Sequence, residues 1–249
     1  MSISLTFHND TFSLNRLHLP SRYYYFNDVQ NYIKLLSIGE GIFPKDKIRT
    51  NITLENSDAV FTTESATKVY PSQKELGINA IHLKLINSNL EFINDELILY
   101  KNARFLQLLK IKSDKNSTFF YGDILSHGRS FEDFSFHKMS GKNSFYINNK
   151  LEYLEKYTLE GEQLKTYIHR QNSKNRLFAK LYIKTNANGH FLDILNQNNL
   201  HSFSYTANRK ILIGVLSGNN MSHLKKQLHF IWDLYRVSLE KNKFNLGKQ

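Results

Sequence analysis

The sequence predicts a mainly β protein that forms one domain over residues 1–249 and ends in a helix. Aromatic residues make up 13% of the chain, with 18 Phe and 14 Tyr, whereas Pro occurs only 3 times. Aromatic side chains favour strands, and a hydrophobic content of 41% is typical of a folded domain. Short strands that alternate with turns over most of the chain predict a sandwich, a barrel or a solenoid-like stack of sheets.

The expected strands are bounded by Gly, Asn, Asp and Ser, and several of them alternate apolar with polar residues. In the first strand, Ile3, Leu5 and Phe7 alternate in this way. The expected strands cover 2–8, 48–54, 59–63, 78–86, 90–93, 103–112 and 118–125. Residues 143–159 predict a β-hairpin whose turn is Asn148-Asn149-Lys150.

The last part of the chain has a helical period instead. Apolar residues recur there at steps of three and four, which predicts an amphipathic helix within residues 220–244. These residues are Leu224, Leu228, Ile231, Trp232, Tyr235 and Leu239. Asn220 or Ser222 is expected to cap its start. A second, shorter helix is expected over residues 190–197.

The charge and the cysteine content narrow the classes of function. A net charge of +11 favours an anionic partner, namely nucleic acid, a membrane surface or an acidic protein, but the basic residues are scattered rather than clustered. With Cys at 0, disulfides, thiolate metal sites and cysteine nucleophiles are excluded. The first residues lack a signal-peptide pattern and no apolar run approaches about 18 residues, so a cytoplasmic protein with no membrane contact is expected.

Common catalytic motifs are absent from the sequence. It has no nucleophile elbow, Walker motif, dinucleotide fingerprint or chelating histidine pair. A chain of this size without such a set is expected to be a scaffold or carrier rather than an enzyme. Glu64, Glu91, Glu96 and Asp123 lie near the ends of expected strands, where a carboxylate serves as a turn residue, an ion-pair partner or a cation ligand.

Residues 62–70, "TTESATKVY", place several short hydroxyl side chains around Glu64 and Lys68 at the end of a strand. This stretch resembles the T-[TS]-Q-[AS]-A-T-K-[VI]-Y strand of the UreD (UreH) family of urease accessory proteins, with Glu64 where Gln is usual. Segments 89–105 and 121–136 and the terminal "LHFIWDLYR" are also similar to the family, in the same order. The resemblance covers residues of about 30 to 240.

One loop departs from the family pattern. The family's G-G-x-x-G-G-D loop corresponds to residues 39–46, where Gly39, Gly41 and Asp46 remain but Pro44 and Lys45 replace the second pair of glycines. If those glycines provide a positive φ, the loop is expected to differ locally in this chain.

The resemblance implies a non-enzymatic urease maturation factor with a β-stack fold and about two helices. Such a protein binds apo-urease and a UreF-type accessory protein, which recruits a UreG-type nickel GTPase. It takes part in Ni²⁺ delivery, for which a water-filled passage through the protein has been proposed, and holds no permanent cofactor. Oxygen ligands without thiolates suit an ion that must be released again.

From this resemblance we expect a set of polar residues to line a nickel path. The path residues are Asp46, Thr63, Glu64, Thr67, Glu96 and Asp123, with Lys68 and Arg129 pairing with or orienting the acids. Trp232, Tyr235 and Arg236 of the terminal helix are expected to bind a partner.

Two other classes of function remain as alternatives at this point. A basic β-sheet module rich in Tyr and Phe could bind single-stranded nucleic acid. A hydrolase could use Glu91 with Glu96 or Asp95, although Glu91 and Asp95 on an extended strand would lie about 13 Å apart.

Overall fold

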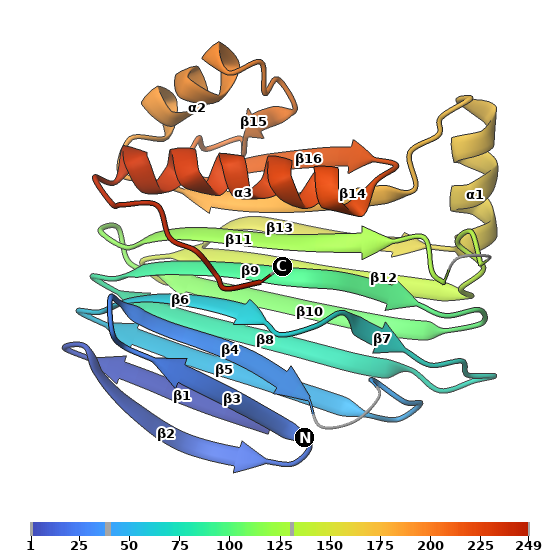
Figure 1. Cartoon of the computed structure of the whole chain (residues 1–249), viewed down its shortest axis with the longest axis horizontal. Coiled ribbons are helices and arrows are strands. Elements are labelled where there is room, and N and C mark those ends of the chain that lie inside the picture. The colour runs from blue at the N-terminus through green and yellow to red at the C-terminus, as the bar shows by residue number, and fades with distance from the viewer. Residues whose placement is uncertain (1, 38–40, 130–131, 249) are drawn as a thin grey trace.

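The computed structural model describes residues 2–37, 41–129 and 132–248, and it places two β-sheets face to face (Figure 1). Sheet A has the strand order β13-β12-β10-β8-β5-β1-β2. Its strands are β1 (Ser2–His8), β2 (Thr11–His18), β5 (Lys47–Glu55), β8 (Gly77–Ile86), β10 (Arg104–Ser113), β12 (Lys138–Ile147) and β13 (Lys150–Leu159).

Sheet B has the order β15-β16-β14-β11-β9-β6-β4-β3, and the short strand β7 also pairs with β9. Its strands are β3 (Ser21–Phe26), β4 (Asn31–Ser37), β6 (Asp58–Thr63), β7 (Thr67–Val69), β9 (Asn89–Leu99), β11 (Thr118–Ser126), β14 (Leu177–Lys184), β15 (Phe203–Tyr205) and β16 (Leu212–Gly218).

The chain winds between the two sheets from β4 to β12. Strands β5, β8, β10 and β12 of sheet A are parallel neighbours, as are β4, β6, β9 and β11 of sheet B. Each turn of the winding therefore adds one strand to each sheet, whereas antiparallel strands close the two ends of the stack. The predicted stack of many short strands is confirmed.

Asn and Ser residues form the corners where the chain passes from sheet A to sheet B. Asn56 and Asn87 have φ values of 48° and 47°, a conformation that Asn adopts more readily than most residues. The Asn87 side-chain amide donates to Asn56 Oδ1 at 3.0 Å. The backbone N–H of Ser57 donates to Ser88 Oγ at 3.2 Å, and that of Ser88 donates to Ser117 Oγ at 3.2 Å. These ladders fix the spacing of successive turns.

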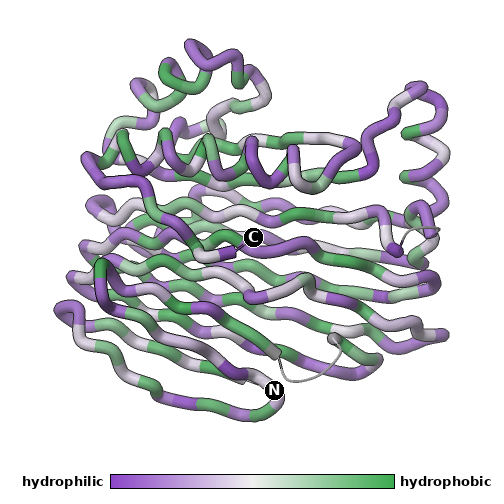
Figure 2. The backbone as a smooth tube through the Cα atoms, in the orientation of Figure 1, coloured by the Kyte–Doolittle hydropathy of each residue, from purple (hydrophilic) through white to green (hydrophobic). Residues whose placement is uncertain are grey.

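Apolar side chains fill two main layers, one between the sheets and one between sheet B and the C-terminal elements. Alternation of apolar and polar residues along the strands is visible in Figure 2. Phe7, Phe61 and Phe92 lie in the first layer, and Leu228 and Trp232 lie in the second. Burial of these two layers supplies the main driving force for the fold.

The helices are α1 (Gly161–Arg170), α2 (Asn188–Gln197) and α3 (Met221–Ser238). The two predicted helices are confirmed as α2 and α3, and the Asn220 side chain caps α3 by accepting the N–H of His223 at 2.9 Å. Helix α1 was not predicted; its apolar stripe is short, with Leu164, Tyr167 and Ile168, and only Ile168 of these is buried. None of the helices in the described part of the chain is long and apolar enough to cross a lipid bilayer.

Candidate functional site: three neighbouring cavities at an interruption in sheet B

Sheet B is interrupted at the segment that follows β6. Strand β6 ends at Thr63 and β7 begins at Thr67, and both pair with the same neighbour, β9. The ladder covers Thr62 with Ile93 and resumes at Thr67 with Leu97, so residues 63–66 and 94–96 form no ladder pairs across this gap. Short side chains occupy the intervening 65–66 segment, which lines cavities on both sides of the sheet.

The other side of β9 is irregular at the same level. The register between β9 and β11 shifts between Gly122 and Ile124, so Asp123 has no partner in that ladder. Instead, the side-chain amide of Asn94 donates to Asp123 Oδ1 at 2.7 Å, and that of Gln107 from sheet A donates to Asp123 Oδ2 at 2.7 Å. A β-bulge of this kind redirects side chains, and here it brings a carboxylate into the space between the sheets.

Three cavities meet at this gap. The inner cavity, of about 350 Å³, and the second cavity, of about 260 Å³, are both lined by strands of the two sheets. The helix cleft, of about 900 Å³, lies between β9, α3 and the C-terminal segment. Each pair of cavities has lining residues in common. The inner and second cavities share Thr67, Asn79, Ile81 and Asn94. The second cavity and the cleft share Ser65 and Ala66, and the inner cavity and the cleft share Asn94, Asp95 and Ile124. The three cavities are therefore neighbours that share walls at this gap.

A row of residues across sheet A forms one wall of the inner cavity. Asn79, Gln107 and Gly141 are ladder neighbours on β8, β10 and β12, and Gly141 pairs with Tyr157 on β13. A Cβ atom on Gly141 would lie 2.3 Å from the Tyr157 ring, so the glycine makes room for that ring. At this one level of sheet A, the inward-facing position of each strand is therefore not an aliphatic residue.

A second row lies opposite, on sheet B. Asp123 pairs with Lys180 in the ladder between β11 and β14. The Lys180 ammonium forms an ion pair with Glu155 of β13, and Glu155 also accepts hydrogen bonds from Asn143 and Tyr182. Burial alone would raise the pKa of Glu155, but the Lys180 ammonium and these hydrogen bonds lower it below its usual range.

Asp123 differs from Glu155 because the groups that donate to it within the described residues are neutral. Burial raises the pKa of the Asp123 carboxyl to about 6, against the opposing effects of its hydrogen bonds and the charge of Lys180. The group is therefore ionised at pH 7 and takes up a proton in mildly acidic solution. A buried carboxylate that lacks an ion-pair partner is a position where a cation is stabilised.

The helix cleft contains carboxylates that are already neutralised. Asp95 forms ion pairs with Lys225 at 3.1 Å and with Lys248 at 2.7 Å, and Glu96 forms one with Lys225 at 2.7 Å. In Figure 1 the C-terminal segment descends from α3 across β11 and β9, which places Lys248 at this opening. Two lysines thus occupy the positions that a cation would take in the cleft.

Candidate metal ligands are dispersed within 2–37, 41–129 and 132–248. No group of three His, Asp or Glu side chains in these ranges lies close enough together to hold a metal ion. His229 lines the cleft, and burial, together with the charge of Lys248, lowers its pKa and keeps the imidazole neutral at pH 7. The site offers single, separated ligands, which suit weak binding rather than storage.

Five of the six predicted path residues line this cavity system. These are Thr63, Glu64, Thr67, Glu96 and Asp123. Asp46 does not line it. Its carboxylate accepts the N–H of Phe43 at 2.9 Å, and its carbonyl accepts the N–H of Ile78 at 2.8 Å, so it closes a turn.

The two predicted orienting residues do not pair with the path acids. Glu64 forms an ion pair with Lys34 at 3.2 Å instead of with Lys68, and Lys68 is exposed at the rim of the second cavity. The guanidinium of Arg129 lies 3.7 Å from the centre of the Tyr100 ring, away from the cavities.

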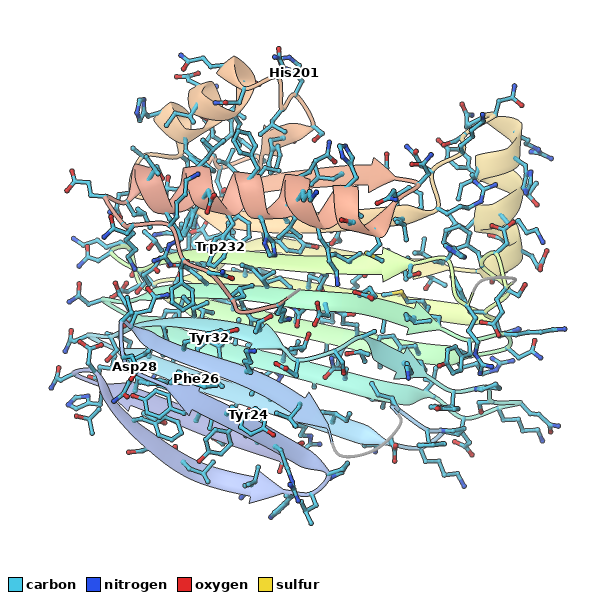
Figure 3. All side chains as sticks on the ribbon, viewed as in Figure 1. Tyr24, Phe26, Asp28, Tyr32, His201 and Trp232 are labelled. Atoms are coloured by element: carbon cyan, nitrogen blue, oxygen red, sulfur yellow. The ribbon has the colours of Figure 1, made fainter. Side chains whose placement is uncertain are left out.

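The three residues expected to bind a partner are buried. Trp232, Tyr235 and Arg236 are exposed by 1%, 0% and 3%. The indole N–H of Trp232 and the guanidinium of Arg236 both donate to Glu91 Oε2, at 2.5 and 2.6 Å, and Asn89 donates to the Tyr235 hydroxyl at 2.6 Å. Figure 3 shows Trp232 between α3 and the sheet below it. These side chains attach α3 to sheet B and do not form an exposed surface.

The same contacts weaken the hydrolase alternative. Glu91 is held by Arg236, and Asp95 and Glu96 are held by Lys225. None of these carboxylates is left free to act as an acid or base.

The loop that departs from the family pattern keeps a left-handed backbone. Lys45 has a φ of 73°, so the conformation that suits glycine is adopted by a lysine there. Gly41 has a φ of 148°, and a Cβ atom on it would lie 2.3 Å from the carbonyl oxygen of Lys68. Gly39 and Glu40 lie outside the described residues.

Several site residues were not predicted from the sequence. They are Asn79, Asn94, Gln107, Asn143, Glu155, Tyr157, Lys180 and Tyr182. The sequence indicates such a residue when a polar side chain stands at an inward-facing position of a strand, as Gln107 does between Phe105 and Leu109. The signal becomes specific only when the strand register places several such residues side by side.

Comparison with known proteins gives a consistent assignment. The family described as UreD urease accessory protein matches residues 19–246. The urease accessory protein UreD of Aliarcobacter butzleri (strain RM4018) is 60% identical over 250 residues, covering 100% of both chains. UreD of Bacillus sp. (strain TB-90) is 30% identical over 181 residues, covering 70% of this chain and 66% of its own. The chain therefore belongs to the UreD family of urease accessory proteins.

Proposed function

We propose that the chain is a non-catalytic urease maturation factor that conducts Ni²⁺ through the cavity system to apo-urease. The observation that carries the proposal is the Asp123 carboxylate, which lines the inner cavity beside the amides of Asn94 and Gln107 and lacks an ion-pair partner among the described residues. A cation entering this space exchanges water for carboxylate, amide and hydroxyl oxygens, which are ligands weak enough to release it again.

The proposed route uses the interruption in sheet B. From the helix cleft the ion passes Asp95 and Asn94, enters between the sheets at Asp123, and continues along the row of Asn79 and Gln107. Lys225 and Lys248 neutralise the cleft carboxylates in the absence of the ion and move aside when it arrives. Nickel is the cargo of this route and not a resident cofactor.

The proposed partners follow from the family. An accessory protein of urease acts with urease and with other accessory proteins, and we propose a UreF-type protein as the direct partner and a UreG-type nickel GTPase as a partner bound through it. We place this assembly in the cytoplasm, with neither nucleic acid nor membrane as a ligand.

The test is urease activation in cells that carry the cognate urease genes but lack this chain. Asp123→Asn is expected to lower activation at limiting Ni²⁺ by about tenfold or more, as loss of supporting groups does at metal sites, while binding of the UreF-type protein in pull-downs stays unchanged. Asp193→Asn, at an exposed position on α2, is the matched control and should activate fully. Full activation by Asp123→Asn would contradict the route.

A further inference from the structure

A basic pocket of about 670 Å³ lies at the end of the sandwich where β14 ends and α2 begins. Four cationic side chains line it, namely those of Lys115, Lys184, Arg209 and Lys210, together with several Asn side chains. It shares no lining residue with the inner cavity, the second cavity or the helix cleft. It is therefore separate from the proposed nickel route.

The pocket carries an excess of positive charge. Lys210 is neutralised by Glu152 at 2.7 Å, but Lys115, Lys184 and Arg209 form no ion pair within the described part of the chain. The oxygens of nearby Asp114 are occupied by the backbone N–H groups of 87 and 117 and by the Ser117 hydroxyl. An anion in this pocket would meet three cations whose charge is not yet balanced.

Lys184 is the most buried of these cations, with 6% of its surface exposed. Its ammonium donates to the carbonyl oxygen of Lys115 at 2.9 Å and to that of Ser117. An ammonium group has three donors, so one remains for a ligand. Burial lowers the pKa of Lys184, which means that the protein environment alone does not compensate its charge.

The start of α2 adds backbone donors on the same side. Ala187 occupies the capping position without a side-chain hydrogen bond, and the first turn contains no acidic residue. Phe191 is the first residue whose N–H has a helical acceptor, at Ala187, whereas the N–H groups of Asn188 and Gly189 have no acceptor among the described residues. Asn188 and Gly189 line the pocket, so the positive end of the helix dipole lies at it.

We propose that this pocket binds a phosphate-type oxyanion, either free phosphate or the terminal phosphates of a nucleotide. A tetrahedral dianion offers acceptor oxygens in several directions, which matches donors that arrive from separate elements: ammonium groups from the β11 and β14 ends, a guanidinium from the turn before β16, and N–H groups from α2. A ligand with a single carboxylate has fewer acceptor oxygens and would leave some of these donors without a partner.

The test is isothermal titration calorimetry of the full chain at low ionic strength with phosphate, adenosine triphosphate and adenosine. Phosphate and the nucleotide should bind, and adenosine should not. Tighter binding of the nucleotide would identify the nucleotide as the source of the phosphate, and equal or weaker binding would identify free phosphate. The proposal requires a Kd of ~1 mM or lower for phosphate or for the nucleotide. If neither ligand binds at a concentration of about 10 mM, the proposal is overturned.

Matched variants locate the binding. Lys115→Gln with Arg209→Gln should weaken phosphate binding by about tenfold or more, because charge-assisted hydrogen bonds are lost. Lys156→Gln with Lys174→Gln removes the same charge from exposed positions outside the pocket and should leave the affinity within about twofold. Equal weakening by both pairs would show nonspecific attraction and would reject the site.

Discussion

Glu91 is a buried carboxylate and Asp123 a half-buried one, on the neighbouring strands β9 and β11, and their surroundings are opposite. Glu91 faces α3, where Arg236 and Trp232 both donate to one of its oxygens and Lys241 lies 3.7 Å from the other. Asp123 faces the inner cavity, where its hydrogen bonds come from the neutral amides of Asn94 and Gln107.

The difference separates a structural carboxylate from an available one. The charge of Glu91 is balanced within the chain, so this residue is committed to holding α3 on sheet B. The charge of Asp123 is only partly compensated, so a proton or a cation that enters the cavity is stabilised there. Loss of the first group is expected to affect folding, and loss of the second to affect transport.

The largest effect is expected at the structural pair. Arg236→Met should lower the free energy of unfolding by about 3–5 kcal/mol, because it leaves a buried carboxylate without its main partner. Urea denaturation measures this. The double variant Arg236→Met with Glu91→Gln should recover part of the loss, since the uncompensated charge is gone. A double variant no more stable than Arg236→Met would mean that charge balance is not what holds α3.

A smaller effect is expected at Asp123, and it depends on pH. Its folded pKa of about 6 exceeds the usual 3.8, so the folded chain binds more protons between these values and loses stability as the pH rises through them. From pH 5 to pH 7 the wild type should lose about 1 kcal/mol of unfolding free energy relative to Asp123→Asn. Parallel curves for the two proteins over this range would contradict a raised pKa.

The smallest effect is expected at the exposed rim. Glu64→Gln restores the residue usual in the family and removes the ion pair with Lys34, in which 41% of the Glu64 side chain is exposed. Thermal unfolding should change by less than about 1 kcal/mol, as for other exposed pairs. A larger loss of unfolding free energy would mean that Glu64 is a structural carboxylate, as Glu91 is.

The fold could be predicted where periodicity is strong. The alternation of Ile3, Leu5 and Phe7 and the stripe of Leu224, Leu228 and Ile231 predict β1 and α3, because each set buries one face. Strand β2 has mostly exposed side chains, and α1 buries only one side chain of its short apolar stripe, so neither was predicted. Tertiary contacts determine these elements more than local sequence does.

The site could be predicted only in part. The hydroxyl-rich segment 62–70 led to three residues that line the cavities, Thr63, Glu64 and Thr67, because its short side chains mark the interruption in sheet B. Gln107 and Lys180 were not predicted, since strand register alone brings them near Asp123. Trp232 and Arg236 were assigned to a partner surface, because an amphipathic stripe does not distinguish an external partner from the chain's own sheet.

The gap between β6 and β7 also affects which motions an ion would require in order to cross sheet B. An ion that crossed sheet B there would pass where residues 63–66 form no ladder pairs with β9. Lys225 and Lys248 are half-buried and ion-paired with Asp95, so an ion would displace them by side-chain rotation rather than by collective opening of the fold, which takes microseconds or longer. The stack could therefore remain rigid throughout the passage.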